Sequence, residues 1–141
     1  MIGRLLLSMV SVAGIAAAPG TPDHSIERMM AGGPMLDPPA LAAAIATAEA
    51  SPLGSAANPV RVEMPRGEIA YLRTLRCADD SAPKFGRRGS MGEGPFGSIV
   101  DLYDVDCGAA APGRVEIRMD MYHPGHVETR AVPGFTTANT I

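Results

Sequence analysis

The stretch "RVEIRMDM", Arg114 to Met121, alternates charged and apolar residues along its whole length. Successive side chains of a β-strand point to opposite faces, so this period of two predicts a half-buried strand. The residues expected on its buried face are Val115, Ile117, Met119 and Met121.

The segment before it, residues 98–107, has the same period, and the turn "GAAAPG" joins the two. They therefore predict a β-hairpin, although Asp101 places an acidic side chain on the otherwise apolar face of the first strand. If the strand pairing keeps parity, the polar faces of the two strands meet as a solvated charge ladder. Its expected members are Asp104, Asp106, Arg114 and Arg118.

Two further strands are predicted upstream, at residues 60–64 and 68–77, with a tight reversal at "MPRGE" between them. The second of these segments also permits a helical interpretation, because Ile69, Leu72 and Leu75 share one side of a helix. Its tyrosine and threonine residues and the turn before it favour the strand.

A helix is predicted over residues 40–50, where "ALAAAIATAEA" consists almost entirely of good helix formers. Asp37 suits the N-cap, and Pro38 suits the first helical position, where its missing N–H costs nothing. The predicted fold class is therefore α+β, with one N-terminal helix packed on a small antiparallel sheet of about four strands and one disulfide. Residues 77–97 are expected to form a long polar loop.

The expected organisation is a single α+β domain over residues 40–136 with a tail at 137–141. Residues 19–39 are rich in Pro, Gly and Met and lack an apolar period, which predicts a flexible segment. Residues 1–18 place Arg4 before a short apolar run and small residues, the pattern of a signal peptide. That run is shorter than the roughly 20 residues that a membrane span needs.

Cleavage after Ala18 would leave Pro19 at the cut, whereas cleavage after Ala16 avoids it, so we expect a mature chain starting near Ala17. The product is expected to be periplasmic or secreted, with no stable membrane span after signal removal. Charges of both signs are interspersed around a formal net charge of -3. No field of one sign is therefore available for nucleic acid or anionic lipid.

Cys77 and Cys107 are the only two cysteines. In an exported chain such a pair favours one disulfide, and free thiols or a soft-metal pair are the alternatives. Closing a loop of this length is expected to stabilise the fold by about 3 to 4 kcal/mol in the chain-entropy model.

A candidate metal site surrounds "HPGH", residues 123–126, which has proline and glycine at the central places of a type II turn. Such a turn brings its end residues within about 7 Å, so both imidazoles could converge on one ion. Two methionines share a strand face with the first histidine, and thioethers with imidazole suit copper as Cu(I). A carboxylate with both histidines would suit zinc instead. The candidate ligands are His123, His126, Met119, Met121 and Glu128.

A purely structural interpretation of the same stretch is also open. Met119 and Met121 continue a core face, where methionine fills gaps. His123 then ends the strand and His126 faces water. Type II turns also splay strands, which would part the two histidines.

Arg87 and Arg88 lie among glycines in the predicted loop and form a candidate site for an anion or a partner. The nearby "GEGPFGSIV", residues 92–100, has the glycine spacing of a kinase phosphate loop, but no lysine and no catalytic motif follow it. Its glycines more simply allow sharp turns. Because no nucleophile with a placed base is recognisable, a small hydrolase has the least support.

The segments "GEGPFGSIVDLYDVDCG", "DMYHPGHVE" and "VPGFT" resemble stretches of short exported bacterial proteins of unassigned function. The resemblance covers residues 59–136 and implies export and a compact domain, with no catalytic residues. The sequence therefore favours a non-enzymatic binding or structural module of the cell envelope without a cofactor. Its partner would be an unknown envelope protein or ligand, bound at the Arg87–Arg88 loop or a sheet edge. The alternative function is periplasmic binding of copper or zinc by "MDMYHPGH".

Overall fold

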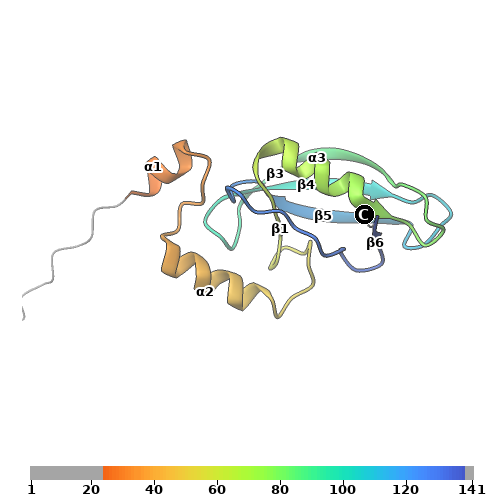
Figure 1. Ribbon diagram of the computed structural model, residues 1–141, viewed down its shortest axis with the longest axis horizontal. Helices are drawn as coiled ribbons and strands as arrows, with labels where there is room; N and C mark the ends of the chain where they lie inside the picture. Colours follow the sequence, from red (N-terminus) through yellow and green to blue (C-terminus); the bar gives the residue numbers. More distant parts are fainter. Residues whose placement is uncertain (1–23, 139–141) are drawn as a thin grey trace, which may run out of the picture.

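The structure, a computed structural model, describes residues 24–138 (Figure 1). The expected signal peptide, residues 1–18, lies outside the described residues, as do the last three residues of the expected tail. The elements in chain order are α1 (Ser25–Met30), α2 (Pro38–Ala48), β1 (Val60–Arg61), α3 (Met64–Thr74), β2 (Leu75–Arg76), β3 (Lys84–Glu93), β4 (Ile99–Asp106), β5 (Arg114–Asp120) and β6 (Thr136–Thr137).

The main sheet has four strands in the order β1-β5-β4-β3. Strands β3, β4 and β5 are antiparallel neighbours, whereas β1 runs parallel to β5. The sheet is therefore mixed, which confirms an α+β fold with a four-stranded sheet and corrects the expectation of a purely antiparallel one. The prediction of a hairpin formed by residues 60–64 and 68–77 was wrong. Strand β1 pairs with β5, far along the chain, and not with the segment that follows β1.

The β4–β5 hairpin follows the register that the alternating pattern predicts. Asp106 lies opposite Arg114, and the two side chains form an ion pair of 3.1 Å. Asp104 instead lies opposite Glu116, and Arg88 of β3 pairs with both of these carboxylates. The charge ladder therefore exists in part, because Arg118, an expected member, lies opposite Leu102, and an arginine from the neighbouring strand takes its place.

Helix α3 covers the sheet (Figure 1) and replaces the reversal expected at residues 64–68 and most of the strand expected at residues 68–77. Only the end of that expected strand, Leu75–Arg76, is extended, as β2. The expectation was wrong because the strand preference of Tyr71 and Thr74 is weaker than the packing of an apolar helix face. Glu68, Tyr71 and Leu72 are buried, at the spacing of one side of a helix. The proline of "MPRGE" stands in the first turn of this helix, where a missing N–H is harmless.

Helix α2 matches the predicted N-terminal helix in its position and its cap. The Asp37 side chain accepts a hydrogen bond of 2.9 Å from the backbone N–H of Ala40. Within the helix only Ala48 is buried, and α2 lies apart from the sheet in Figure 1, close to Ala57 and Pro95 in neighbouring loops. The prediction of a single helix packed on the sheet is not confirmed, since the described residues contain three helices and α3 is the one that covers the sheet.

Strand β3 occupies the middle of residues 77–97, where a long loop was expected. That prediction was wrong because the segment has few apolar residues, and an edge strand can form without a buried face. None of the ten residues of β3 is fully buried. Its pairing with β4 has register shifts between Arg87 and Gly89 and between Ser90 and Glu93. The glycines of this segment therefore belong to an irregular edge strand.

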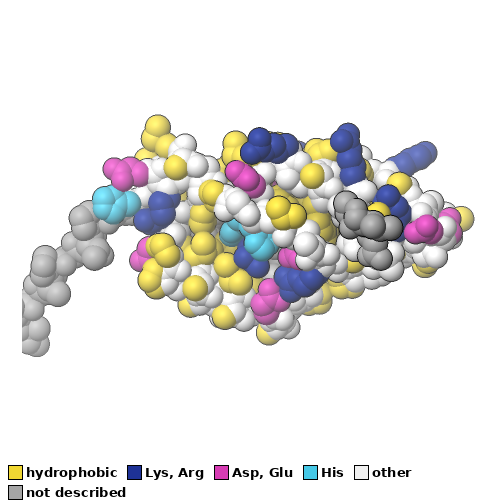
Figure 2. All heavy atoms as spheres, in the orientation of Figure 1, with side chains coloured by type: hydrophobic (Ala, Val, Ile, Leu, Met, Phe, Trp, Pro, Cys, Tyr) yellow, Lys and Arg dark blue, Asp and Glu magenta, His cyan; other side chains and the backbone are white. Residues whose placement is uncertain are grey.

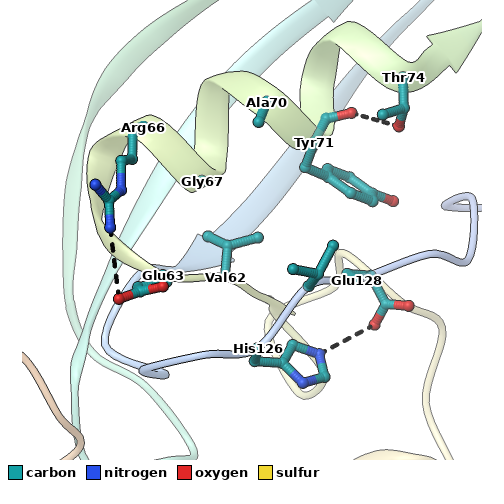
Figure 3. Close-up of a pocket in the computed structure, with 10 residues that line it drawn as sticks. Val62, Glu63, Arg66, Gly67, Ala70, Tyr71, Thr74, His126 and Glu128 are labelled. Atoms are coloured by element: carbon teal, nitrogen blue, oxygen red, sulfur yellow. Dashed lines mark hydrogen bonds and ion pairs between the residues drawn. The ribbon is translucent and has the colours of Figure 1, made fainter.

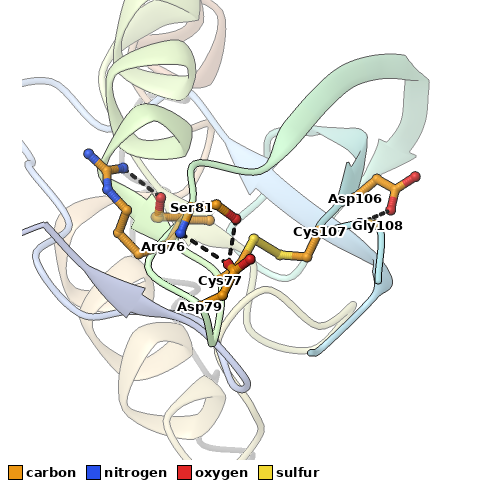
Figure 4. Close-up of a disulfide and its surroundings, with 8 residues drawn as sticks. Arg76, Cys77, Asp79, Ser81, Asp106, Cys107 and Gly108 are labelled. Atoms are coloured by element: carbon orange, nitrogen blue, oxygen red, sulfur yellow. Dashed lines mark hydrogen bonds between the residues drawn. A yellow bond between two sulfur atoms is a disulfide. The ribbon is translucent and has the colours of Figure 1, made fainter. Parts of the chain in front are cut away.

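Cys77 and Cys107 form the expected disulfide, with Cα atoms 5.8 Å apart (Figure 4). Cys107 follows β4, and Cys77 follows β2 and precedes β3. Because Lys84 at the start of β3 pairs with Asp106 at the end of β4, the two cysteine segments meet at the same end of the sheet. The antiparallel pairing of β3 with β4 thus brings the two cysteines together.

The buried core lies between α3 and the sheet and extends to the C-terminal segment. Its members are Val60, Val62, Tyr71, Leu72, Leu75, Cys77, Tyr103, Val105, Ile117, Met119, Val132 and Phe135. The expected tail begins inside β6, which pairs with β2. The segment expected to lack structure, residues 19–39, contains α1, although none of the α1 residues is buried. Among residues 24–138, no helix combines the length and apolar character needed to cross a membrane.

Candidate binding groove between α3 and residues 126–128

A groove of about 410 Å³ runs between α3 and the extended segment 126–128 (Figure 3). On the helix side, Gly67, Ala70 and Thr74 follow one another at intervals of three and four residues and leave room because they are small. On the other side, the Val127 side chain is 78% exposed. The residues that line the groove are Val62, Glu63, Arg66, Gly67, Ala70, Tyr71, Thr74, His126, Val127 and Glu128.

Charged groups stand at two places along this otherwise apolar groove. Glu63 and Arg66 form an ion pair of 3.6 Å at the start of α3. His126 and Glu128 point toward each other from the facing segment, with 3.9 Å between Nε2 and Oε2 (Figure 3). Nε2 of His126 is buried and has no hydrogen-bond partner. Burial is the main cause that lowers the pKa of His126, so its imidazole is neutral at pH 7.

Arg130 fixes the carboxylate at the end of the groove. Burial alone would raise the pKa of Glu128, but hydrogen bonds from the side chain and backbone of Arg130 outweigh it and lower that pKa. Arg130 also pairs with Glu49, just after α2, at 2.8 Å. Figure 2 shows histidine, arginine and acidic side chains gathered near the middle of this face. The ion pairs tie the far wall of the groove to α2.

Tyr71 joins the floor of the groove to the C-terminal segment. Its hydroxyl donates to the backbone carbonyl of Arg130 at 2.9 Å and accepts from the backbone N–H of Val132 at 3.1 Å. Burial raises the pKa of Tyr71 well above its usual range, so this hydroxyl keeps its proton. The segment 126–132 is thus held against α3 at one end while Val127 remains open to solvent.

The histidine turn forms as predicted, but its two histidines contact different carboxylates. The backbone N–H of His126 donates to the carbonyl of His123 at 3.1 Å, and Gly125 has the positive φ of +73° that a type II turn needs. His123 is buried, 3.3 Å from Asp120, and its ring meets Phe96 edge-on at 5.3 Å. His126 faces the groove instead.

The methionines of the predicted metal site are core residues. Met119 is fully buried, and Met121 is half-buried against the same core. Glu128 bonds to Arg130 and lies beside one histidine only. Within residues 24–138, no three side chains of the His, Cys, Asp and Glu types form a metal-binding group. Copper or zinc binding at this turn stays a prediction. The fold places Met119 and Met121 against the core, whereas His126 and Glu128 line the groove.

Arg87 and Arg88 are strand residues with carboxylate partners, which corrects their placement in a loop. Arg87 makes two hydrogen bonds to the buried Asp101, of 2.6 and 2.7 Å. Arg88 pairs with Asp104 and with Glu116, the latter at 2.5 Å. Hydrogen bonds to these carboxylates raise the pKa of both arginines. An anion at this place would compete with carboxylates already bound.

A buried carboxylate on α3 was missed entirely by the sequence analysis. Glu68 is only 1% exposed, and one of its oxygens accepts a hydrogen bond of 2.9 Å from the Tyr103 hydroxyl. The other oxygen, Oε1, has no partner. Burial raises the pKa of Glu68 to about 7. The helical pattern of Ile69, Leu72 and Leu75 was the signal that could have revealed both this residue and the groove.

Comparison with known proteins assigns no role to this groove. No protein-family model, curated protein or solved structure matches the chain. The function must therefore be argued from the groove and its surroundings.

Proposed function

We propose that the protein is an exported, non-enzymatic binding module of the cell envelope, and that its ligand site is the groove between α3 and residues 126–128. The observation that carries the proposal is an apolar groove of about 410 Å³ whose exposed lip is Val127, 78% open to solvent. Ligand sites are typically concave and mostly apolar with a few placed polar groups, which is the character of this groove.

The groove suits an apolar group of a partner or ligand that carries a polar end. Its centre is lined by Ala70, Val62 and Tyr71. Its charged side chains already have partners, since Glu63 pairs with Arg66 and Glu128 pairs with Arg130. A ligand that enters would release water from apolar walls without breaking an ion pair. A binding role also fits the placement of the Asp120–His123 pair, which is buried away from the groove and from solvent.

The binding proposal is tested by filling the groove. Ala70 is exposed on α3, so Ala70→Phe places a ring in the groove without disturbing the core. Ala42→Phe makes the same change at an exposed alanine of α2 that does not line the groove. We expect saturable binding of the apolar dye Nile red to be lost in the first variant and kept in the second. Circular dichroism checks that both fold.

The cellular partner is sought by photo-crosslinking from the groove lip. A benzophenone amino acid replaces Val127 in one experiment and the exposed Ile99 of β4 in a control. We expect a discrete crosslinked product from position 127, absent from position 99 and absent when Ala70→Phe is added. Identical products from both positions, or products unaffected by Ala70→Phe, would contradict a binding role for the groove.

Export is supported by the signal-peptide pattern of residues 1–18 and by the disulfide between Cys77 and Cys107. Its test is mass spectrometry of the protein taken from cell fractions. The expected species is an envelope form that starts near Ala17 and has lost two hydrogens through disulfide formation. A full-length chain with two alkylatable thiols in the cytosolic fraction would contradict export.

A further inference from the structure

The two outer edges of the main sheet differ in length. Strand β1, at one edge, has two residues, whereas β3, at the other, has ten. Among residues 24–138, only β4 forms backbone hydrogen bonds with β3, so the outer side of this strand has no backbone partner. An unpaired row of N–H and C=O groups on a long edge strand is a template for pairing with another chain. The outer side of β3 is therefore a candidate interaction surface.

The side chains of β3 leave its outer side open. Arg87 and Arg88 turn back over their own sheet, where they pair with carboxylates of β4 and β5. A Cβ atom placed on Gly86, Gly89 or Gly92 would meet nothing within 4 Å. A glycine inside a strand often marks a place where another backbone approaches closely. A second strand can therefore reach this edge without displacing a charged side chain.

The charges of β3 indicate which strand fits this edge. Lys84 begins β3 and Glu93 ends it, and both are exposed. Neither side chain forms an ion pair within the part of the chain that the structure describes. A second copy of β3 in antiparallel orientation would place its Glu93 beside Lys84 and its Lys84 beside Glu93, and opposite charges across two strands are stabilising. A parallel copy would instead bring like charges together. The strand is thus complementary to itself in the antiparallel orientation.

We propose that β3 is the interface between two copies of this chain, which pair antiparallel about a two-fold axis through Gly89 and join their four-stranded sheets. A surface that is complementary to itself gives a closed dimer. Gly86 and Gly92 stand at equal intervals from Gly89, so each lies opposite the other across the axis. The axis is perpendicular to the joined sheet, and α3 and its groove therefore lie on the same side in both copies.

Two register shifts weaken the expected dimer. They interrupt the pairing of β3 with β4 between Arg87 and Gly89 and between Ser90 and Glu93. Bulges of this kind disrupt the local ladder and protect edge strands against extensive pairing. A single pair of strands also buries little surface, and small interfaces belong to transient complexes. The dimer is therefore reversible and forms as the protein concentration rises. It is separate from ligand binding, because no residue of β3 lines the groove.

The first test uses Lys84, which is the only lysine in the sequence. A water-soluble carbodiimide joins its amine to a nearby carboxylate. Asp106 lies opposite Lys84 on β4, so a crosslink between them within one chain is the internal control. Lys84 and Glu93 of one chain lie about 30 Å apart along the strand, so a crosslink between these two residues arises only between copies. We expect it in mixtures of chains labelled with light and heavy nitrogen, where its hybrid mass identifies it. The control crosslink without this product would contradict the proposed pairing.

The second test reverses the charges at the two ends of β3. Lys84→Glu and Glu93→Lys each bring like charges together at both ends, and each should weaken the dimer about tenfold in sedimentation equilibrium. The double variant restores opposite charges and should return to the wild-type affinity. Arg73→Glu, at an exposed arginine of α3, makes a matched reversal away from β3 and should leave the affinity unchanged. Circular dichroism checks that all four variants fold.

Two further outcomes would overturn the proposal. A protein that stays monomeric up to millimolar concentration leaves the edge to a strand from a different protein. A dimer with the same affinity in Lys84→Glu, in Glu93→Lys and in the wild type has its interface elsewhere. The two single variants are independent, so misfolding of one leaves the other, together with the crosslink, as the test.

Discussion

The two faces of the sheet carry similar ion pairs in different surroundings. On the face under α3, which we term the covered face, Arg87 pairs with Asp101, whose side chain is only 7% exposed. On the opposite face, Arg88 pairs with Asp104 and Glu116, whose side chains are 40% and 45% exposed, and we term this exposed part the open face. The two arginines are adjacent in sequence, and the pleat of β3 sends one to each face. Burial of the acidic partner, more than the number of ion pairs, should decide what each contributes to stability.

The largest difference between the faces is expected from Glu68, the α3 carboxylate over the covered face. Its pKa is raised by burial from its ordinary value of 4.5 to about 7. A carboxylate with a raised pKa stabilises the fold fully below pH 4.5, and this contribution is lost as pH rises through 7. The difference amounts to about 3 kcal/mol in the free energy of unfolding. Glu68→Gln is expected to remove this fall, as measured by urea unfolding between pH 4.5 and 8.

A matched control removes a carboxylate from the open face. Glu116→Gln makes the same chemical change at a half-exposed position. This variant should keep the loss of stability between pH 4.5 and 8. If Glu68→Gln keeps it too, then burial of Glu68 does not govern the pH dependence, and the contrast between the faces fails at its strongest point.

The next largest effect is expected from Arg87→Ala, which leaves the buried carboxylate of Asp101 without its two hydrogen bonds. An unpaired buried charge destabilises a fold strongly. The melting temperature should fall by about 10 °C. Adding Asp101→Asn removes the uncompensated charge and should restore part of the loss. No recovery in the double variant would mean that Arg87 acts through its aliphatic stem and not through its charge.

The open face was predictable from sequence because its chemistry is local. The alternation in residues 114–121 fixed the strand and its buried face, and the turn before it fixed the hairpin. Asp106 and Arg114 therefore met as expected. The ion pair between Asp104 and Arg88 was not predictable in this way. Arg88 lies on a third strand, β3, and the alternating pattern of β4 and β5 gives no information about the side chains of a neighbouring strand.

The covered face and the groove were not predictable in the same way. Residues 64–74 satisfy a helical and a strand pattern together, and only the packing of Tyr71 and Leu72 on the sheet decides between them. A strand over residues 68–77 predicts neither the burial of Glu68 nor a groove beside Ala70. The prediction of the disulfide is nevertheless correct, because it rests on the number of cysteines and not on the order of the strands.

A smaller effect on the covered face is expected from Tyr103→Phe. The substitution removes the hydroxyl that donates to Glu68 at 2.9 Å and leaves that carboxyl group without a partner. The expected loss is about 1 to 2 kcal/mol. It should be greater at pH 8 than at pH 5, because a hydrogen bond to the ionised carboxylate is stronger than one to the neutral acid. Urea unfolding of both proteins at the two pH values measures this difference. An equal loss at both would contradict titration of Glu68 within the fold.

The smallest effect is expected from Arg88→Ala on the open face. Exposed ion pairs contribute little, so the melting temperature should fall by less than about 3 °C. Asp104 and Glu116 lie directly opposite each other, however, and Arg88 is the cation between them. Its removal leaves two like charges side by side, and their repulsion is screened by salt. The loss should therefore shrink from low salt to 0.5 M sodium chloride, whereas the loss in Arg87→Ala should persist because its carboxylate is buried. Equal salt dependence in the two arginine variants would show that the faces do not differ in the way their burial implies.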